Sequence, residues 1–537
     1  MYRTSFQRPL SGRAGASVRC GLLAVGLLLV PAARLAAQEA PRAAVPSPEE
    51  FLGYALGERF TPSAAVVAYF ERLAAAAPDR VRIEPYGMTV EGRPLIQAVI
   101  GRPAYLAELD EILARNRALT DPSLSESEAA AIAATNPAIV YFSYGVHGNE
   151  SSSSEAAMWV AWDLVREAPE VAGALADAIV VIDPIVNPDG RDRYVIWYNQ
   201  ARGIVPNPDP DAREHDEPWP GGRYNHYLFD LNRDWTWSTQ AETRQRLATW
   251  ERWMPQVHVD YHEMSPSSSY FFFPAAAPIN PVYPAHVLEW GRIIGAANAA
   301  AFDRQGWEFF TGESYDFFYP GYGDAWPALM GTVGMTYEQA GGGSAGLVYE
   351  QPDGDLLTLH DRAQHHRTTS HATLSAAASG KVELLEGFAA TFRALPGELP
   401  DFLIVPGPDP RRTESLVALL QDQGLRVERA GRAFEADGQA HQGWAERSRF
   451  PAGTFLVRAG QPRGRLAVTL LQPETELDAT FSYDISAWSL PFAYGVETHR
   501  VRRAPGADWR PAAAYDRGFE PSAGSDWTGT VVRAGTQ

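Results

Sequence analysis

The sequence predicts an α/β fold followed by a second, smaller α/β unit. Apolar runs at 138–146, 178–188 and 255–264 are typical of strands buried on both faces. Residues 155–168, after the first run, have apolar side chains at helical spacing. Alternation of strands with helices indicates an α/β sheet. The 537 residues are too many for one compact domain, so two folded units are expected.

Further elements follow in order. Residues 60–81 and 104–119 have helical spacing, and residues 80–101 contain two β-rich runs that predict a hairpin. Residues 331–338 predict another strand. After a break near 393–401, the pattern predicts a strand, a helix, two strands and a helix.

The predicted boundaries are a signal peptide at 1–37, a catalytic domain at 38–390, a smaller domain at 396–500 and a tail at 501–537. Arginines precede a short apolar stretch and then small residues, as in secretory signals. The stretch is too short to span a bilayer comfortably, so we expect a secreted or periplasmic protein with no stable membrane span after cleavage. An uncleaved signal that acts as an anchor remains the alternative.

The composition excludes some classes of function. A net charge of −19 and a pI of about 5.1 leave no basic surface for phosphates, so nucleic acid is not an expected partner. The only cysteine, Cys20, lies in the predicted signal, so the mature chain has no thiol chemistry. Catalysis must use other side chains or a metal.

One short motif suggests a metal site. His147 follows the first buried strand and Glu150 opens the next helix, so both side chains can converge on one point. A catalytic zinc ion takes three protein ligands. In the extended run 255–264, His258, Asp260 and His262 share one face, and His262 lies nearest the strand end. Asp260 can orient a ligand, and His258 is expected to be a buried core residue.

Taken together, the motifs resemble those of the carboxypeptidase A-like zinc metallocarboxypeptidases. Seven segments occur in the order of that family: VEGRPL (90–95), HGNE (147–150), NPDGRDR (187–193), FDLNRDW (229–235), VDYH (259–262), YPGYGDAW (319–326) and MTYEQ (335–339). The resemblance covers about residues 48–380. It implies a mixed central sheet flanked by helices and an enzyme that cleaves peptides with a free C-terminal carboxylate.

The resemblance also implies residue roles. His147, Glu150 and His262 would bind one Zn²⁺ ion, and Glu338 would be the general base. A carboxylate suits that role because the metal has already lowered the pKa of the attacking water.

The resemblance assigns substrate contacts too. Asn232 and Arg233 would bind the terminal carboxylate of the substrate, since a guanidinium group matches a carboxylate with two hydrogen bonds. Arg202 would stabilise the oxyanion. The competing arginines for that role are Arg191, Arg193 and Arg223.

A tyrosine would close over the substrate. Tyr319 is the expected residue, with Tyr315 and Tyr322 as alternatives. Asp324 can line the specificity pocket and favour a basic side chain, but we expect an exposed turn residue there.

Three other features have competing interpretations. Ser344 in GGSAG fits a nucleophile pattern, but no helix is expected after it, which favours a glycine loop. The histidines near 360–371 suggest a second metal site, although a helix with partly exposed histidines fits their spacing better. Residues 396–500 resemble a glutamine-amidotransferase-like domain, most clearly at 483–495, but without the catalytic cysteine.

The resemblance therefore implies a zinc carboxypeptidase, and the predicted signal peptide implies that it is exported. The alternatives are a zinc amidase that acts on cell-wall peptides and, in another class, a non-catalytic binding protein with the same fold.

Overall fold

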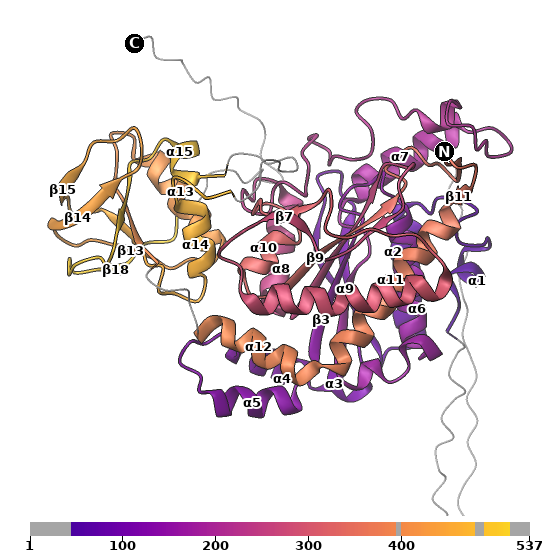
Figure 1. The fold of residues 1–537 in the computed structure, drawn as a ribbon, viewed down its shortest axis with the longest axis horizontal. Helices are drawn as coiled ribbons and strands as arrows, with labels where there is room; N and C mark the ends of the chain where they lie inside the picture. Colours follow the sequence, from indigo (N-terminus) through magenta and orange to yellow (C-terminus); the bar gives the residue numbers. More distant parts are fainter. Residues whose placement is uncertain (1–44, 394–398, 478–487, 516–537) are drawn as a thin grey trace, which may run out of the picture. The chain divides into compact units, whose positions relative to one another are not determined.

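The computed structural model describes residues 45–393, 399–477 and 488–515, and its two largest sheets have seven strands each (Figure 1). The predicted signal peptide at 1–37 lies outside the described residues. So does the end of the predicted C-terminal tail, from residue 516 onward.

The first sheet is mixed and has the order β1-β2-β4-β3-β5-β9-β6. Its strands are β1 (Val81–Met88), β2 (Pro94–Ile100), β3 (Ala138–Tyr144), β4 (Ala178–Asp183), β5 (Val257–Met264), β6 (Tyr270–Phe271) and β9 (Val333–Ala340). The pairs β3-β4, β3-β5 and β5-β9 are parallel, and the other three are antiparallel. The predicted mixed sheet is confirmed, and the expected hairpin is β1-β2.

Helices surround this sheet. They are α1 (Pro48–Leu52), α2 (Ser63–Ala76), α3 (Pro103–Ala107), α4 (Leu109–Ala118), α5 (Glu126–Thr135), α6 (Ser152–Val165), α7 (Pro188–Ala201), α8 (Ala241–Trp253), α9 (Ala285–Gln305), α10 (Ala325–Leu329), α11 (Leu359–Ser379) and α12 (Lys381–Arg393). Short 3₁₀ turns lie at Pro169–Val171, Ala174–Ala176 and Arg213–His215. Two small sheets pair β7 (Ala276–Ile279) with β8 (Asp316–Phe317) and β10 (Val348–Glu350) with β11 (Leu356–Thr358).

Alternation along β5 shows that both faces of the sheet are covered. Tyr261 points to α11, where its hydroxyl lies 2.7 Å from that of Ser370. His258 points to the other face, where the indole N–H of Trp250 on α8 donates to it over 3.0 Å. Because strand side chains alternate between faces, Asp260 and His262 share the face of His258.

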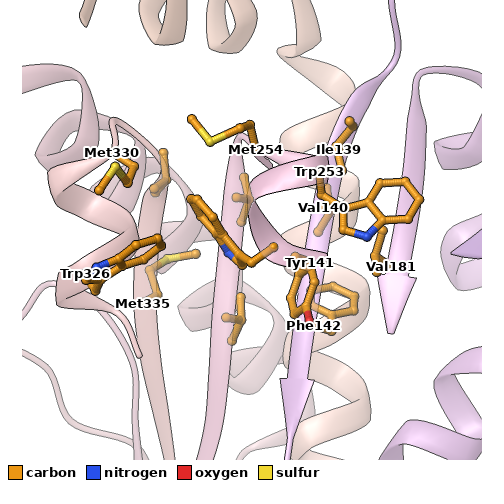
Figure 2. Packing of buried hydrophobic residues seen from close by; sticks show 14 of the residues in the cluster. Ile139, Val140, Tyr141, Phe142, Val181, Trp253, Met254, Trp326, Met330 and Met335 are labelled. Atoms are coloured by element: carbon orange, nitrogen blue, oxygen red, sulfur yellow. The ribbon is translucent and has the colours of Figure 1, made fainter. Parts of the chain in front are cut away.

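Every residue of β3 and β4 is buried, as their apolar sequences predict. Figure 2 shows part of this core, in which Tyr141 and Phe142 of β3 lie near Val181 of β4. Trp253 from α8 and Trp326 from α10 are also labelled there and are fully buried. The sheet is thus a rigid support for residues at its strand ends.

The second sheet is formed by the C-terminal region, residues 399–515. Its order is β15-β14-β17-β12-β16-β13-β18 and all its pairs are antiparallel. The elements are β12 (Asp401–Ile404), α13 (Pro410–Asp422), β13 (Val427–Arg429), β14 (Phe434–Ala440), β15 (Arg447–Phe450), β16 (Phe455–Val457), α14 (Gly464–Leu471), α15 (Leu490–Tyr494), β17 (Thr498–Val501) and β18 (Arg510–Pro511). The predicted order is present from β12 to α14, with β14 and β15 as additional strands. After α14, the additional elements are α15, β17 and β18, and β18 lies within the predicted tail.

Candidate active site

Three side chains meet where β3 and β5 end. His147 follows β3, Glu150 precedes α6, and His262 lies near the end of β5. All three are at least 96% buried. Gly148 between the first two allows this close packing, because a Cβ there would lie 2.0 Å from the backbone nitrogen of Arg191.

The potential ligand atoms of this triad face one another. The two Nδ1 atoms of His147 and His262 are 3.3 Å apart. The carboxylate of Glu150 bridges them, with Oε1 2.8 Å from Nδ1 of His147 and Oε2 3.1 Å from Nδ1 of His262. The pKa of Glu150 is lowered: burial raises it, but the two histidines outweigh that effect.

The outer nitrogens of both histidines have carboxylate neighbours. Nε2 of His147 lies 2.9 Å from Asp230, and Nε2 of His262 lies 3.0 Å from Asp260. A carboxylate behind a histidine fixes the ring so that its other nitrogen can bind a metal. Sequence reasoning singled out Asp260 but not Asp230. The available signal for Asp230 was its position two residues before Asn232.

This donor set fits zinc. Two imidazole nitrogens and one carboxylate are the ligands of many catalytic zinc sites, and calcium and magnesium prefer oxygen. Tetrahedral ligands about 2.0 Å from an ion lie about 3.3 Å apart, which is close to the observed 3.3 Å between the histidine nitrogens. Within the described ranges, no other group of histidines, cysteines and carboxylates has this potential.

Glu338 lies beside the triad. On the parallel strands β5 and β9 it is the register partner of His262, and both residues line the same pocket. Burial raises the pKa of Glu338 to about 8, against the opposing charge of His262. A cation bound to the triad would lower this pKa, so the carboxylate can hold or release a proton near neutral pH.

The pocket has a volume of about 330 Å³. It is lined by His147, Asn149, Glu150, Arg223, Asn232, Arg233, His262, Glu263, Met264, Ser265, Tyr315, Asp316, Tyr322, Asp324, Thr336, Glu338 and Gly342. It therefore brings together most of the residues predicted from the sequence. Arg202 and Tyr319 are not among its lining residues.

The arginines differ in what they contact. Arg223 lines the pocket and donates to Glu150 over 3.1 Å and to Asp230 over 2.9 Å. Arg202 forms the C-terminal cap of α7. Arg191 makes a buried ion pair of 2.7 Å with Glu155 on α6. Arg193 donates to the backbone carbonyls of residues 221, 224 and 225. Of the four, Arg223 alone lines the pocket.

Asn232 and Arg233 form one wall of the pocket. The side-chain oxygen of Asn232 accepts a hydrogen bond of 2.7 Å from the backbone N–H of Gly323. The guanidinium group of Arg233 lies 4.6 Å from the ring centre of Tyr322, and both residues line the pocket. The contact between the Arg233 guanidinium group and the Tyr322 ring thus connects this wall to the segment 319–326.

The three tyrosines named as candidates occupy different positions. Tyr319 is fully buried, and its hydroxyl donates to the carbonyl of Arg233 and accepts from Trp237, both over 3.2 Å. Tyr315 and Tyr322 line the pocket. Tyr319 therefore supports the backbone of Arg233 from outside the pocket, whereas Tyr315 and Tyr322 face the cavity.

The expectation of an exposed Asp324 is wrong. Asp324 is 8% exposed and lines the pocket, and burial raises its pKa to about 7. The physical reason lies in the neighbouring strand β9. Gly334 has no side chain, and a Cβ there would lie 1.9 Å from the carbonyl oxygen of Asp324. The turn therefore packs directly against the sheet.

The competing features do not assemble into sites. The loop that carries Ser344 leads into strand β10 rather than a helix, as the glycine-loop interpretation expects. Three histidines of α11 have separate partners. His365 lies 2.6 Å from Gln339, and His366 lies 2.8 Å from Tyr270. His371 lies beside the carboxylate of Asp163. They stabilise packing around the helix.

Comparison with known proteins adds family information. A family model described as "Zinc carboxypeptidase" matches residues 66–278, which is less than half of the chain. The match includes the triad, Asn232 and Arg233, but ends before Glu338 and the C-terminal region. The glutamine-amidotransferase resemblance therefore receives no support from it, and residues 483–487 of its most recognisable stretch lie outside the described residues. A comparison with curated proteins gave no match.

Three solved structures with similarity to this chain are two carboxypeptidases and a thrombin-activatable fibrinolysis inhibitor. A metallo-carboxypeptidase from Burkholderia cenocepacia is 17% identical, with a TM-score of 0.40, over 59% of this chain and 68% of the other. Carboxypeptidase A from Helicoverpa armigera is 16% identical, with a TM-score of 0.40, over 62% and 76%. Bovine thrombin-activatable fibrinolysis inhibitor is 13% identical, with a TM-score of 0.40, over 61% and 99%.

Proposed function

We propose that this protein is a zinc-dependent carboxypeptidase that hydrolyses the last peptide bond of substrates with a free C-terminal carboxylate. The observation that carries the proposal is the convergence of His147, Glu150 and His262 with Glu338 in one pocket. The family match over residues 66–278 supports it.

The triad would hold one zinc ion, which when bound polarises a carbonyl and lowers the pKa of water. Glu338 acts as the general base: its carboxylate accepts a proton from the attacking water and passes it to the leaving nitrogen. Asp230 and Asp260 keep the imidazoles oriented. A buried carboxylate with a raised pKa suits proton transfer in both directions.

Arg233 and Asn232 bind the substrate carboxylate, because charge-assisted hydrogen bonds to a carboxylate are strong and directional. For the charge that develops on the substrate carbonyl, we propose Arg223 in place of Arg202, since Arg223 lines the pocket and contacts Glu150. Tyr322 replaces Tyr319 as the aromatic residue that faces bound substrate.

We also propose where the protein acts. Residues 1–37 have the pattern of a secretory signal, so we propose a secreted or periplasmic enzyme. Among the described helices, none is both long and apolar enough to cross a membrane.

Three measurements on the purified protein test the function. Metal analysis is expected to find one zinc per chain, and its removal by a chelator is expected to abolish hydrolysis. Peptides with a free C terminus should be cleaved at the last bond, whereas the same peptides with an amidated C terminus should resist. Equal cleavage of both forms would favour the zinc amidase instead, and bound zinc without hydrolysis would favour a binding protein.

A further inference from the structure

One side chain of the C-terminal region contacts two segments next to the pocket wall. Gln423 follows α13 and is completely buried. Its Oε1 accepts a hydrogen bond of 2.6 Å from the indole N–H of Trp326 on α10. Its Nε2 donates to the backbone carbonyls of Trp235 over 2.9 Å and Thr236 over 3.2 Å. A single amide thus joins two segments of the first region.

Each of these two segments continues into residues that line the pocket. Trp235 lies two residues after Arg233, and Trp326 lies two residues after Asp324; Arg233 and Asp324 are both lining residues. The segments also contact each other on the pocket side, where Asn232 accepts from the backbone at 323. Gln423 connects the same two segments from the opposite side.

The orientation of the amide is determined by its partners. An indole N–H can only donate and a backbone carbonyl can only accept, so oxygen must face Trp326 and nitrogen must face the 235–236 backbone. Because all these groups are buried, loss of the amide leaves one donor and two acceptors without partners. The two segments would then move to recover hydrogen bonds, and Asn232 and Arg233 would move with them.

A second contact keeps Gln423 in place. Arg463 donates to the backbone carbonyl of Gln423 and to the carboxylate of Glu251 on α8, both over 2.7 Å. Trp488 of the C-terminal region also packs its ring 6.0 Å from that of Tyr319. The C-terminal region therefore contacts the first region at Glu251 and Tyr319 as well, and the hydrogen bonds of Gln423 reach both segments.

We propose that Gln423 is a positioning residue that sets the spacing between the carboxylate-binding segment and α10, and so makes the C-terminal region part of the substrate-binding apparatus. This inference rests on the proposed carboxypeptidase function. It assigns the C-terminal region a role in binding the substrate carboxylate, separate from the metal chemistry.

The test uses the full-length protein loaded with zinc and compares Gln423→Met with Gln461→Met. Gln461 is a matched control: it is also buried and makes three hydrogen bonds, but all of them go to Arg426 and Arg458 within the C-terminal region. Methionine keeps the length of glutamine and removes its polar atoms.

For Gln423→Met we expect KM for a peptide with a free C terminus to rise about three- to tenfold, the equivalent of about one hydrogen bond, with kcat within about twofold of wild type. Gln461→Met should lower the melting temperature to a similar degree and leave KM unchanged. Zinc content should stay at the wild-type value in both. Gln423→Asn, which is too short to bond to both segments, should raise KM in the same direction and serves if the methionine variant does not fold.

Equal KM values for the Gln423 variants and wild type would overturn the inference, and so would an equal rise in Gln461→Met. Failure of the proposed function looks different. If the wild-type protein contains zinc but does not cleave peptides with a free C terminus, the proposed carboxypeptidase function is wrong, whatever the variants show.

Discussion

The two seven-stranded sheets differ in how their strands run, and this difference decides where chemistry can occur. In the first sheet, β3, β5 and β9 are parallel, so their carboxyl ends meet at one edge with His147, His262 and Glu338. In the C-terminal sheet every pair is antiparallel, and strand ends of the same kind alternate between its two edges. The parallel strands of the first sheet bring the proposed ligands together, whereas the C-terminal region contributes through Gln423 after α13.

The largest expected effect comes from a change to the catalytic residues at the first sheet, with the C-terminal sheet left intact. Replacement of Glu338 by Gln removes the proton acceptor and should lower kcat about 10²- to 10⁴-fold, the usual contribution of general base catalysis. Zinc content and folding should remain as in wild type, because Glu338 is not among the proposed ligands. Steady-state kinetics on a peptide substrate gives the result.

Glu350→Gln is the control for this change, since Glu350 is an exposed residue of β10 outside the pocket. It should keep wild-type kinetics. Undiminished hydrolysis by Glu338→Gln would mean that another group takes the proton.

The next effect concerns a carboxylate buried in the first sheet. Burial raises the pKa of Asp183, at the end of β4, from 3.8 to about 7, and Tyr86 donates to its carboxylate over 2.7 Å. The folded protein therefore keeps this proton up to about pH 7, whereas the unfolded chain loses it near pH 4. Since the folded state binds more protons between these values, stability falls as the pH rises through that range.

Replacement of Asp183 by Asn should remove this loss, because the amide stays neutral and can still accept from Tyr86. The difference in unfolding free energy between Asp183→Asn and wild type should grow in favour of the variant by up to about 4 kcal/mol from pH 4 to pH 8, about 1.4 kcal/mol for each unit of pKa. Urea unfolding at several pH values measures it. A difference that does not change with pH would show that Asp183 is ionised throughout.

The same contrast between the sheets explains how much the sequence could predict. Strands buried on both faces, such as β3 and β4, are continuous apolar runs, and their positions follow from hydrophobicity alone. The strands β14 (FEADGQA) and β15 (RSRF) in the C-terminal sheet have exposed positions and few apolar residues. The two strands pair with each other, and β14 also pairs with the distant β17. The prediction missed both β14 and β15.

Within the site, residues at strand ends were predictable and residues on loops were less so. His262 and Glu338 lie near the ends of neighbouring strands, and their motifs follow the order found in a known family. The choice among four arginines depends on distant partners, as Arg191 shows by its pairing with Glu155 and Arg223 by its contact with Glu150. No local pattern contains that information.

The smallest expected effect compares one carboxylate from each region. Asp230 orients His147, so Asp230→Asn should weaken zinc binding about 10- to 100-fold, as loss of such partners usually does. Asp401, in the C-terminal region, is buried and accepts from two backbone N–H groups, those of Ala459 and Ala504. Asp401→Asn should lower stability without a change in zinc affinity, because its contacts remain within the C-terminal region. Competition with a chelator measures both affinities. Similar weakening in the two variants would mean that zinc binding responds to overall stability rather than to the orientation of His147.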